Sequence, residues 1–206
     1  MSFMFLDHNT NITKTDLIAG FVSNKRLLVV LLMLCLTASV AFSGQMPNAP
    51  EGYKWYESKH GVGTFLKPKG WYIKEDETKG TKALFITKQK IKKNGVFVTG
   101  LTVNQVPDFH KNTGKIPSEY AKGFIAQLIK SNKAIKVFNL PRGKTVMHGA
   151  QIQTTGDGLT TRMHYLAFGN DVEDKLYLIW FEAPEITWDD DFRKAAPILN
   201  MFILGE

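Results

Sequence analysis

Hydrophobic and polar residues alternate over short stretches along most of the chain from Tyr53 onward, with turn residues between the stretches. Alternation bounded by Gly, Pro, Asn and Asp is typical of β-strands with one buried face. One segment, Leu176–Phe181, is apolar at every position, which favours a central strand covered on both faces. The pattern predicts strands at 53–56, 63–66, 71–74, 83–88, 96–103, 135–140, 144–153, 159–168 and 176–181.

Two segments have helical periodicity instead. In Pro117–Asn132, the apolar residues Tyr120, Phe124 and Leu128 recur every four positions and form a stripe along one side of a helix. A last helix is expected after Pro184, close to the end of the chain. We therefore expect the α+β fold class, with one domain in which an antiparallel β-sheet packs against helices.

The N-terminal region has the pattern of a secretory signal sequence. The apolar run Leu27–Leu36 follows two basic residues, and small residues then favour cleavage after Ala41 or Ser43. An uncleaved membrane anchor is the alternative. Extended to Phe42, however, the run has only 16 residues, or ~24 Å of helix against a hydrocarbon core of ~30 Å. We expect residues 1–43 to be the N-terminal region and signal peptide, 44–52 a linker, and 53–206 the domain.

Composition fits an exported, folded protein. The hydrophobic fraction of 44% is sufficient for a packed core, and the net charge of +7 favours anionic partners without selecting one. The single cysteine, Cys35, lies within the expected signal peptide, so the mature domain would contain no disulfide, thiolate metal site or cysteine nucleophile. We expect a periplasmic or secreted protein with no transmembrane segment after processing.

Four patches combine strand, turn and helix features in a characteristic order: Phe65–Trp71 with its Pro-x-Gly-Trp turn, Val96–Val103, Lys175–Pro184, and Trp188–Phe202. Together they resemble the PsbP-like fold. This group includes the extrinsic PsbP protein of photosystem II, exported bacterial domains of unknown function and a small Ran-binding import factor. The resemblance implies a PsbP-like α/β sandwich from about Tyr53 to the end, closest to the exported bacterial domains. The patches form core and turns, so they bear on fold and not on activity.

Catalytic motifs are incomplete in this sequence. Gly143-Lys144-Thr145 resembles the end of a phosphate-binding loop, but Phe138 stands where that motif needs glycine. None of the serines after Ser43 lies in a G-x-S-x-G motif. We therefore predict a protein that is not an enzyme, with no catalytic residues and no cofactor.

Two histidines, His148 and His164, lie on strands expected to form a hairpin through Gly156-Asp157-Gly158. A three-residue loop would place the histidines directly opposite each other, and moving the loop by one residue would make them diagonal neighbours on one face. Paired imidazoles can bind a transition metal or respond to pH. No third ligand is visible in either strand, so we predict no metal site here.

A run of lysines surrounds the strongest hairpin signal, Asn94-Gly95. Pairing Lys93 with Val96 would place alternate lysines on one face of the hairpin, beyond an apolar base. These lysines would be solvated, contribute little to the core and be free to contact an anionic partner. The candidate partner-binding residues are Lys88, Lys90, Lys92 and Lys93.

Export, the lysine hairpin and the missing catalytic motifs favour one function. We expect a non-catalytic binding or accessory module of the cell envelope or the exterior, whose partner is an acidic protein or an anionic envelope surface. Nucleic acid is disfavoured, because the chain is exported and its aromatic residues follow core patterns. The alternative is a metal-dependent envelope enzyme that uses His148 and His164.

Overall fold

The structure of this chain, a computed structural model, describes residues 46–91, 95–143, 145–156 and 158–205. The expected signal peptide and the first two residues of the expected linker lie outside the described residues. Within these ranges, no helix has the length and apolar character needed to cross a membrane. All elements named below belong to one unit, residues 48–206.

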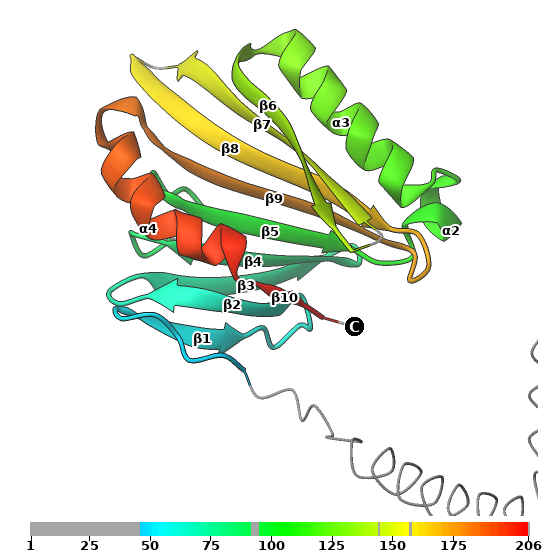
Figure 1. The fold of residues 1–206 in the computed structure, drawn as a ribbon, viewed down its shortest axis with the longest axis horizontal. Helices are drawn as coiled ribbons and strands as arrows, with labels where there is room; N and C mark the ends of the chain where they lie inside the picture. The colour runs from blue at the N-terminus through cyan, green and yellow to red at the C-terminus, as the bar shows by residue number, and fades with distance from the viewer. Residues whose placement is uncertain (1–45, 92–94, 144, 157, 206) are drawn as a thin grey trace, which may run out of the picture. The chain divides into compact units, whose positions relative to one another are not determined.

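Antiparallel strands form two sheets (Figure 1). The small sheet has the order β1-β2-β10, formed by Tyr53–Glu57, Gly63–Pro68 and Ile203–Leu204. The large sheet has the order β3-β4-β5-β9-β8-β7-β6. In chain order its strands are β3 (Tyr72–Thr78), β4 (Thr81–Thr87), β5 (Gly100–Val106), β6 (Lys133–Arg142), β7 (Thr145–Gly156), β8 (Leu159–Asn170) and β9 (Lys175–Pro184).

The described helices connect or cover these strands. The short α2 (Phe109–Thr113), which the sequence pattern did not predict, leads into α3 (Pro117–Ser131). After β9, a single 3-10 turn, η1 (Glu185–Thr187), precedes α4 (Trp188–Asn200). The predicted α+β class and the antiparallel sheet are therefore confirmed, and β9 is the central strand that its apolar sequence indicated.

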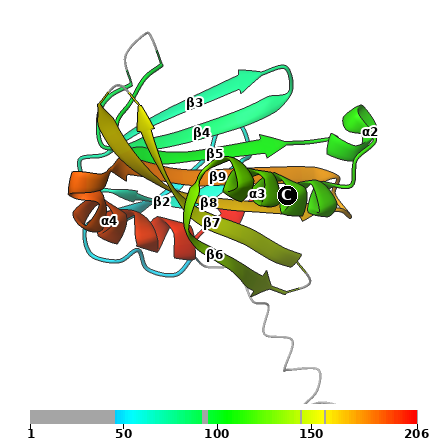
Figure 2. The same cartoon turned by 90° about the horizontal axis from the view of Figure 1, so that it is seen from above.

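The two faces of the large sheet have separate cores. One face packs against the small sheet and α4, and it buries alternate residues of β9 such as Ile179 and Phe181. The opposite face packs against α3, where Ala121 and Ile125 contact the other set of β9 residues, including Leu176. Figure 2 shows α3 lying along the strands on its side of the sheet.

The start of α3 is held close to β8 by a glycine. A Cβ at Gly169 would lie 2.3 Å from the carbonyl carbon of Pro117 and 2.2 Å from the backbone nitrogen of Ser118. Only a residue without a side chain allows this approach. Ser118 also donates hydrogen bonds from its backbone nitrogen and its hydroxyl to Asp171, at 2.9 and 2.6 Å. The position of α3 on the sheet is fixed from its first turn.

The connection between β4 and β5 differs from the predicted hairpin. A two-residue turn at Asn94-Gly95 would pair Thr87 with Thr102, but Thr87 pairs with Gly100. Gln89 explains why the ladder ends early: its backbone oxygen accepts a hydrogen bond from the Thr87 hydroxyl at 2.7 Å, and its side-chain oxygen accepts one from the Thr99 backbone nitrogen at 3.1 Å. The predicted strand at 96–103 accordingly begins only at residue 100.

Candidate functional site

Within the described residues, no helix lies over half of one face of the large sheet. α3 contacts β6 to β9 and lies along β8, while the same face of β3, β4 and β5 remains uncovered by any helix in Figure 2. We call this uncovered face of β3, β4 and β5, together with Trp180 and Glu182 of β9, the open face. It is built from alternate residues of each strand, because successive side chains of a strand point to opposite faces.

Aromatic rings form a row from α3 across to the open face. The ring of Phe124, on α3, lies 6.3 Å from that of Tyr165 on β8, and Tyr165 stacks on Trp180 of β9 at 6.0 Å. Further across the sheet, Phe85 of β4 meets Phe97 edge to face at 6.3 Å. The open face is therefore aromatic over much of its width.

Thr102 lies between the two parts of this row. It pairs with Trp180 on one side and with Phe85 on the other. The residue is 2% exposed, and its hydroxyl has no hydrogen-bond partner among the described residues. A buried hydroxyl without a partner costs free energy, which is unusual in a settled core.

Glu182 is the acidic residue of the open face on β9. It follows Trp180 by two positions and stands opposite Gly100 and Met163 on the neighbouring strands. The described residues provide it with neither a hydrogen bond nor an ion pair. Burial raises the pKa of its carboxyl to about 7. Burial, and then the charge of Glu182, raise the pKa of the Tyr165 hydroxyl to about 12.

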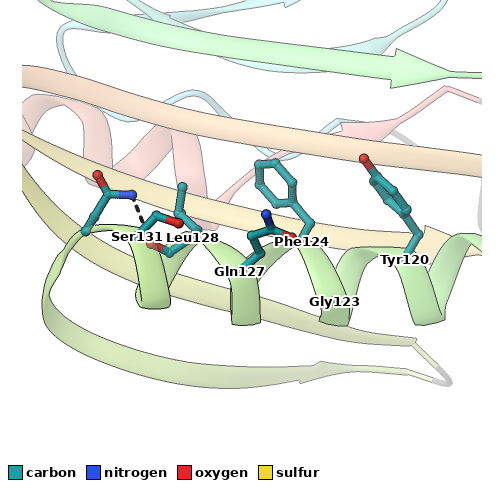
Figure 3. A pocket seen from close by; sticks show the side chains of 7 residues that line it. Tyr120, Gly123, Phe124, Gln127, Leu128 and Ser131 are labelled. Carbon is teal, nitrogen blue, oxygen red and sulfur yellow. Dashed lines mark hydrogen bonds between the residues drawn. The ribbon is translucent and has the colours of Figure 1, made fainter.

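A groove of about 550 Å³ runs along α3, lined by Tyr120, Gly123, Phe124, Gln127, Leu128, Ser131 and Asn132. In Figure 3, Tyr120 and Phe124 point from the same side of α3 toward the sheet. Phe124 lines the groove and contacts Tyr165, which stacks on Trp180, so Phe124 belongs to both the groove and the aromatic row. The groove therefore lies beside the aromatic row, and a partner could contact both.

The expected pairing of His148 and His164 is wrong. The β7–β8 ladder ends with Gly156 opposite Leu159, so His148 pairs with Ala167 and His164 pairs with Gln151. This register differs by one residue from the nearer of the two expected ones, and a one-residue difference moves a side chain to the other face. The histidines therefore point to opposite faces of the sheet and cannot share a metal ion.

Each histidine has its own polar neighbour instead. His148 donates from Nδ1 to the side-chain oxygen of Asn139 at 2.8 Å. His164 Nδ1 lies 3.2 Å from the side-chain nitrogen of Gln151, which can only donate. Its ring lies between Phe138 and Phe192, with centroids at 5.1 and 5.2 Å. Burial, and to a smaller extent the charge of Lys136, lower its pKa to about 4, so the ring is neutral at ordinary pH.

Within the described ranges, no three His, Cys, Asp or Glu side chains are close enough together to hold a metal ion. A smaller cavity of about 260 Å³ lies beside His164, between α4 and the strands β6 to β8. Its lining is mostly apolar, with Gln151 and Asn200 among the polar members. It is separate from the open face, because His164 points to the α4 side of the sheet.

The four candidate lysines have different surroundings. Lys88 directly follows β4, and its ammonium lies 2.8 Å from Oδ1 of Asp191, a residue of α4 that is 1% exposed. Lys90 is exposed to solvent. Lys92 and Lys93 lie outside the described residues. The structure thus pairs Lys88 within the protein.

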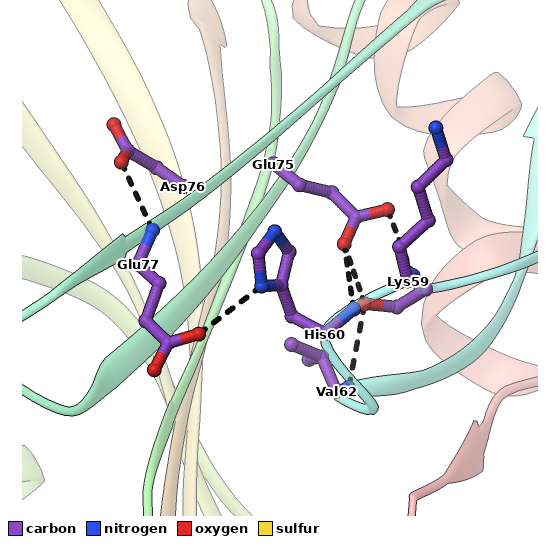
Figure 4. Close-up of polar contacts among 7 residues, drawn as sticks. Lys59, His60, Val62, Glu75, Asp76 and Glu77 are labelled. Atoms are coloured by element: carbon purple, nitrogen blue, oxygen red, sulfur yellow. Dashed lines mark hydrogen bonds and ion pairs between the residues drawn. The ribbon is translucent and has the colours of Figure 1, made fainter.

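A polar cluster around Glu75 links the two sheets. The carboxylate of Glu75, on β3, accepts hydrogen bonds from the Tyr56 and Ser58 hydroxyls at 2.5 and 2.9 Å. It also accepts one from each backbone nitrogen of Lys59 and His60, both at 3.1 Å, as Figure 4 shows. Burial alone would raise the pKa of Glu75, but these hydrogen bonds outweigh it and lower the pKa. Four donors to one carboxylate mark a structural link.

Comparisons with known proteins concern the fold. The sequence matches no known family profile, and no curated protein matches it. Similar solved structures include cyanobacterial PsbP (CyanoP) from Synechocystis sp. PCC 6803, at 13% identity over 79% of this chain and 98% of that chain, with a TM-score of 0.46.

Two further structures come from other organisms. The Ran-binding protein Mog1p of Saccharomyces cerevisiae has 10% identity over 74% of this chain and 95% of its own, with a TM-score of 0.47. LpqN of Mycobacterium tuberculosis, which is involved in cell envelope biogenesis, has 10% identity over 79% of this chain and 83% of its own, with a TM-score of 0.39. Each of these is a similarity to a solved structure, and none assigns a partner or an activity to this chain.

Proposed function

We propose that this protein is an exported, non-catalytic binding module that docks a protein partner on its open face. The observation that supports this most is the aromatic row from α3 to β4, whose part over β4 and β5 no described helix covers. The buried, unpartnered hydroxyl of Thr102 lies within this row. Rigid aromatic rings beside a groove are typical of protein interfaces, because they bury much area at little entropic cost. Export rests on the N-terminal sequence pattern.

Site-specific crosslinking in the producing cell tests the docking surface. A photo-crosslinking residue at Gln127, which is exposed and lines the groove, should form one defined adduct. The same residue at Val172, which is 96% exposed on the turn after β8, should not form it. Trp180→Ala should weaken the adduct at Gln127. No adduct at Gln127, or the same adducts from both positions, would remove the open face as the docking site.

Intact-mass measurement tests export. The protein isolated from the producing cell should begin at Phe42 or Gly44. A mass that retains Leu27–Leu36 would instead support a membrane anchor, and the binding proposal would then apply to an anchored domain.

We propose a second, electrostatic contact at the lysine run. Lys90, with Lys92 and Lys93, would contact an acidic partner or an anionic envelope surface, while Lys88 shares its charge with Asp191. Lys90→Gln should weaken binding to vesicles that contain anionic lipid at low salt, and high salt should remove the difference by screening. Equal binding by both proteins at low salt would leave the lysine run as a solvated loop.

A further inference from the structure

The open face contains one carboxylate whose charge nothing in the described protein compensates. Two other carboxylates of the domain have cationic partners. Asp191 pairs with Lys88 at 2.8 Å. Glu185 receives a hydrogen bond from the Arg162 guanidinium at 2.9 Å. Glu182 differs, although it too is shielded from water. An enclosed carboxylate without a partner is costly when ionised, so its presence calls for an explanation.

The neighbours of Glu182 favour one kind of ligand. Trp180 precedes it by two positions on the same face of β9, and Tyr165 lies close enough that the carboxylate affects its pKa. These two rings stack on each other at 6.0 Å. The faces of aromatic rings carry negative potential and attract ammonium and guanidinium groups, most strongly where water is excluded. A carboxylate beside two such rings can therefore bind an organic cation.

No cationic side chain among the described residues pairs with Glu182. Lys74 also lies on this face, but its ammonium is 5.8 Å from the centre of the Phe85 ring and 3.7 Å from Asp76. The chain as a whole carries a charge of +7, so Glu182 is a local exception to the prevailing charge. A metal ion is a poor fit, because one carboxylate offers too few ligands and aromatic rings offer none.

We propose that Glu182, Trp180 and Tyr165 bind the ammonium or guanidinium group of a lysine or arginine side chain that a protein partner presents to the open face. This rests on the proposed function, which makes the open face the docking surface, and it names the chemistry recognised there. The aliphatic part of the same side chain would lie along the aromatic row, and its charged end would meet the carboxylate. Binding would thus relieve the uncompensated charge of Glu182.

Titration with blocked amino acids tests the proposal on the purified protein. The probes are N-acetyl-lysine methylamide, the arginine equivalent, and N-acetyl-norleucine methylamide, which keeps the aliphatic chain and lacks the charge. The readout is the indole N–H signal of Trp180 in NMR spectra, assigned by its loss in Trp180→Phe. At pH 8 the lysine and arginine probes should shift this signal with affinities on the order of 1 mM, about tenfold tighter than norleucine.

Glu182→Gln should abolish the preference for the charged probes. Asp76→Asn is the matched control, since it removes one exposed carboxylate from β3 on the same face of the sheet and should keep the preference. Equal binding of lysine and norleucine probes, or an unchanged preference in Glu182→Gln, would overturn the cation site. The crosslinking result at Gln127 is independent of these probes, so a failed cation site and a failed docking surface are distinguishable.

Discussion

The Lys88 ammonium lies 2.8 Å from the Asp191 carboxylate, and this ion pair joins the residue after β4 to the buried side of α4. Asp191 is 1% exposed, and its second oxygen has no hydrogen-bond partner among the described residues. Lys88 is therefore the main compensation for a buried charge. Lys88 therefore has a structural role, whereas the sequence pattern predicted that its side chain would be solvated.

Replacing Lys88 and Lys90 separately should separate these roles. Lys88→Gln should lower the free energy of unfolding by about 2 kcal/mol, because it leaves Asp191 buried without a cation. Lys90→Gln, at an exposed position on the same segment, should change it by less than about 0.5 kcal/mol. Urea unfolding of both variants measures the difference. Equal small effects would show that solvent, and not Lys88, compensates Asp191.

The sequence predicted the elements much better than the contacts between them. The strands and α3 follow from local patterns, such as the four-residue spacing of Tyr120, Phe124 and Leu128. The ion pair of Lys88 with Asp191 joins positions 103 apart in the chain, and no local pattern encodes it. Contacts of this kind depend on how whole elements pack.

The sequence led to a wrong pairing of two histidines and did not reveal Glu182, and the reasons differ. For His148 and His164, the Gly-Asp-Gly turn allows several loop lengths, and a one-residue change in register moves a side chain to the opposite face. For Glu182 a signal was present: it is an acidic residue directly after the apolar run 176–181, in a strand expected to be covered on both faces. The role we propose for it depends on the arrangement of whole elements, since no described helix covers β3 to β5.

Glu75 should be important for the junction between the two sheets. Glu75→Ala removes the acceptor for four hydrogen bonds at once, and we expect a loss of about 2–3 kcal/mol in unfolding free energy. Glu77→Ala is the matched control. Glu77 lies on the same face of β3 and makes one exposed hydrogen bond with the His60 ring at 3.1 Å, so its loss should cost less than about 1 kcal/mol.

Hydrogen exchange can localise this effect. In Glu75→Ala the backbone amides of Lys59 and His60 should exchange faster, while those of the central strand β9 should change little. If the loop amides kept their protection, another contact would be holding the loop that follows β1.

The pH dependence of stability should show the buried His164. Its folded-state pKa of about 4 lies below the ordinary value of 6.5, so the unfolded chain binds a proton more readily than the folded one. Stability is therefore fully present above pH 6.5 and is lost as the pH falls toward 4, by at most about 3 kcal/mol. NMR titration of the His164 ring should give a midpoint near pH 4. A midpoint near 6.5 would mean that the ring is hydrated.

Glu182 should give the opposite pH dependence. Its folded-state pKa of about 7 lies above the ordinary value of 4.5, so the folded protein holds the proton more tightly than the unfolded chain. Its destabilising charge is absent below pH 4.5, develops between pH 4.5 and 7, and is complete above pH 7. In the range between 4.5 and 6.5, this trend opposes that of His164, so the wild-type profile alone would hide both.

Comparison with Glu182→Gln isolates the effect. The variant should match the wild type in stability near pH 4.5 and exceed it by up to about 3 kcal/mol above pH 7, because it never acquires the charge. Urea unfolding at several pH values measures this difference, with Asp76→Asn as an exposed control on the same face. The cation probes should also bind more weakly as the pH falls below 7, because Glu182 is then protonated. Tyr165, whose pKa the Glu182 carboxylate affects, stays neutral over this pH range. A variant no more stable than the wild type at pH 8 would show that the Glu182 carboxylate is already compensated, and the open face would then have no charge for a partner to neutralise.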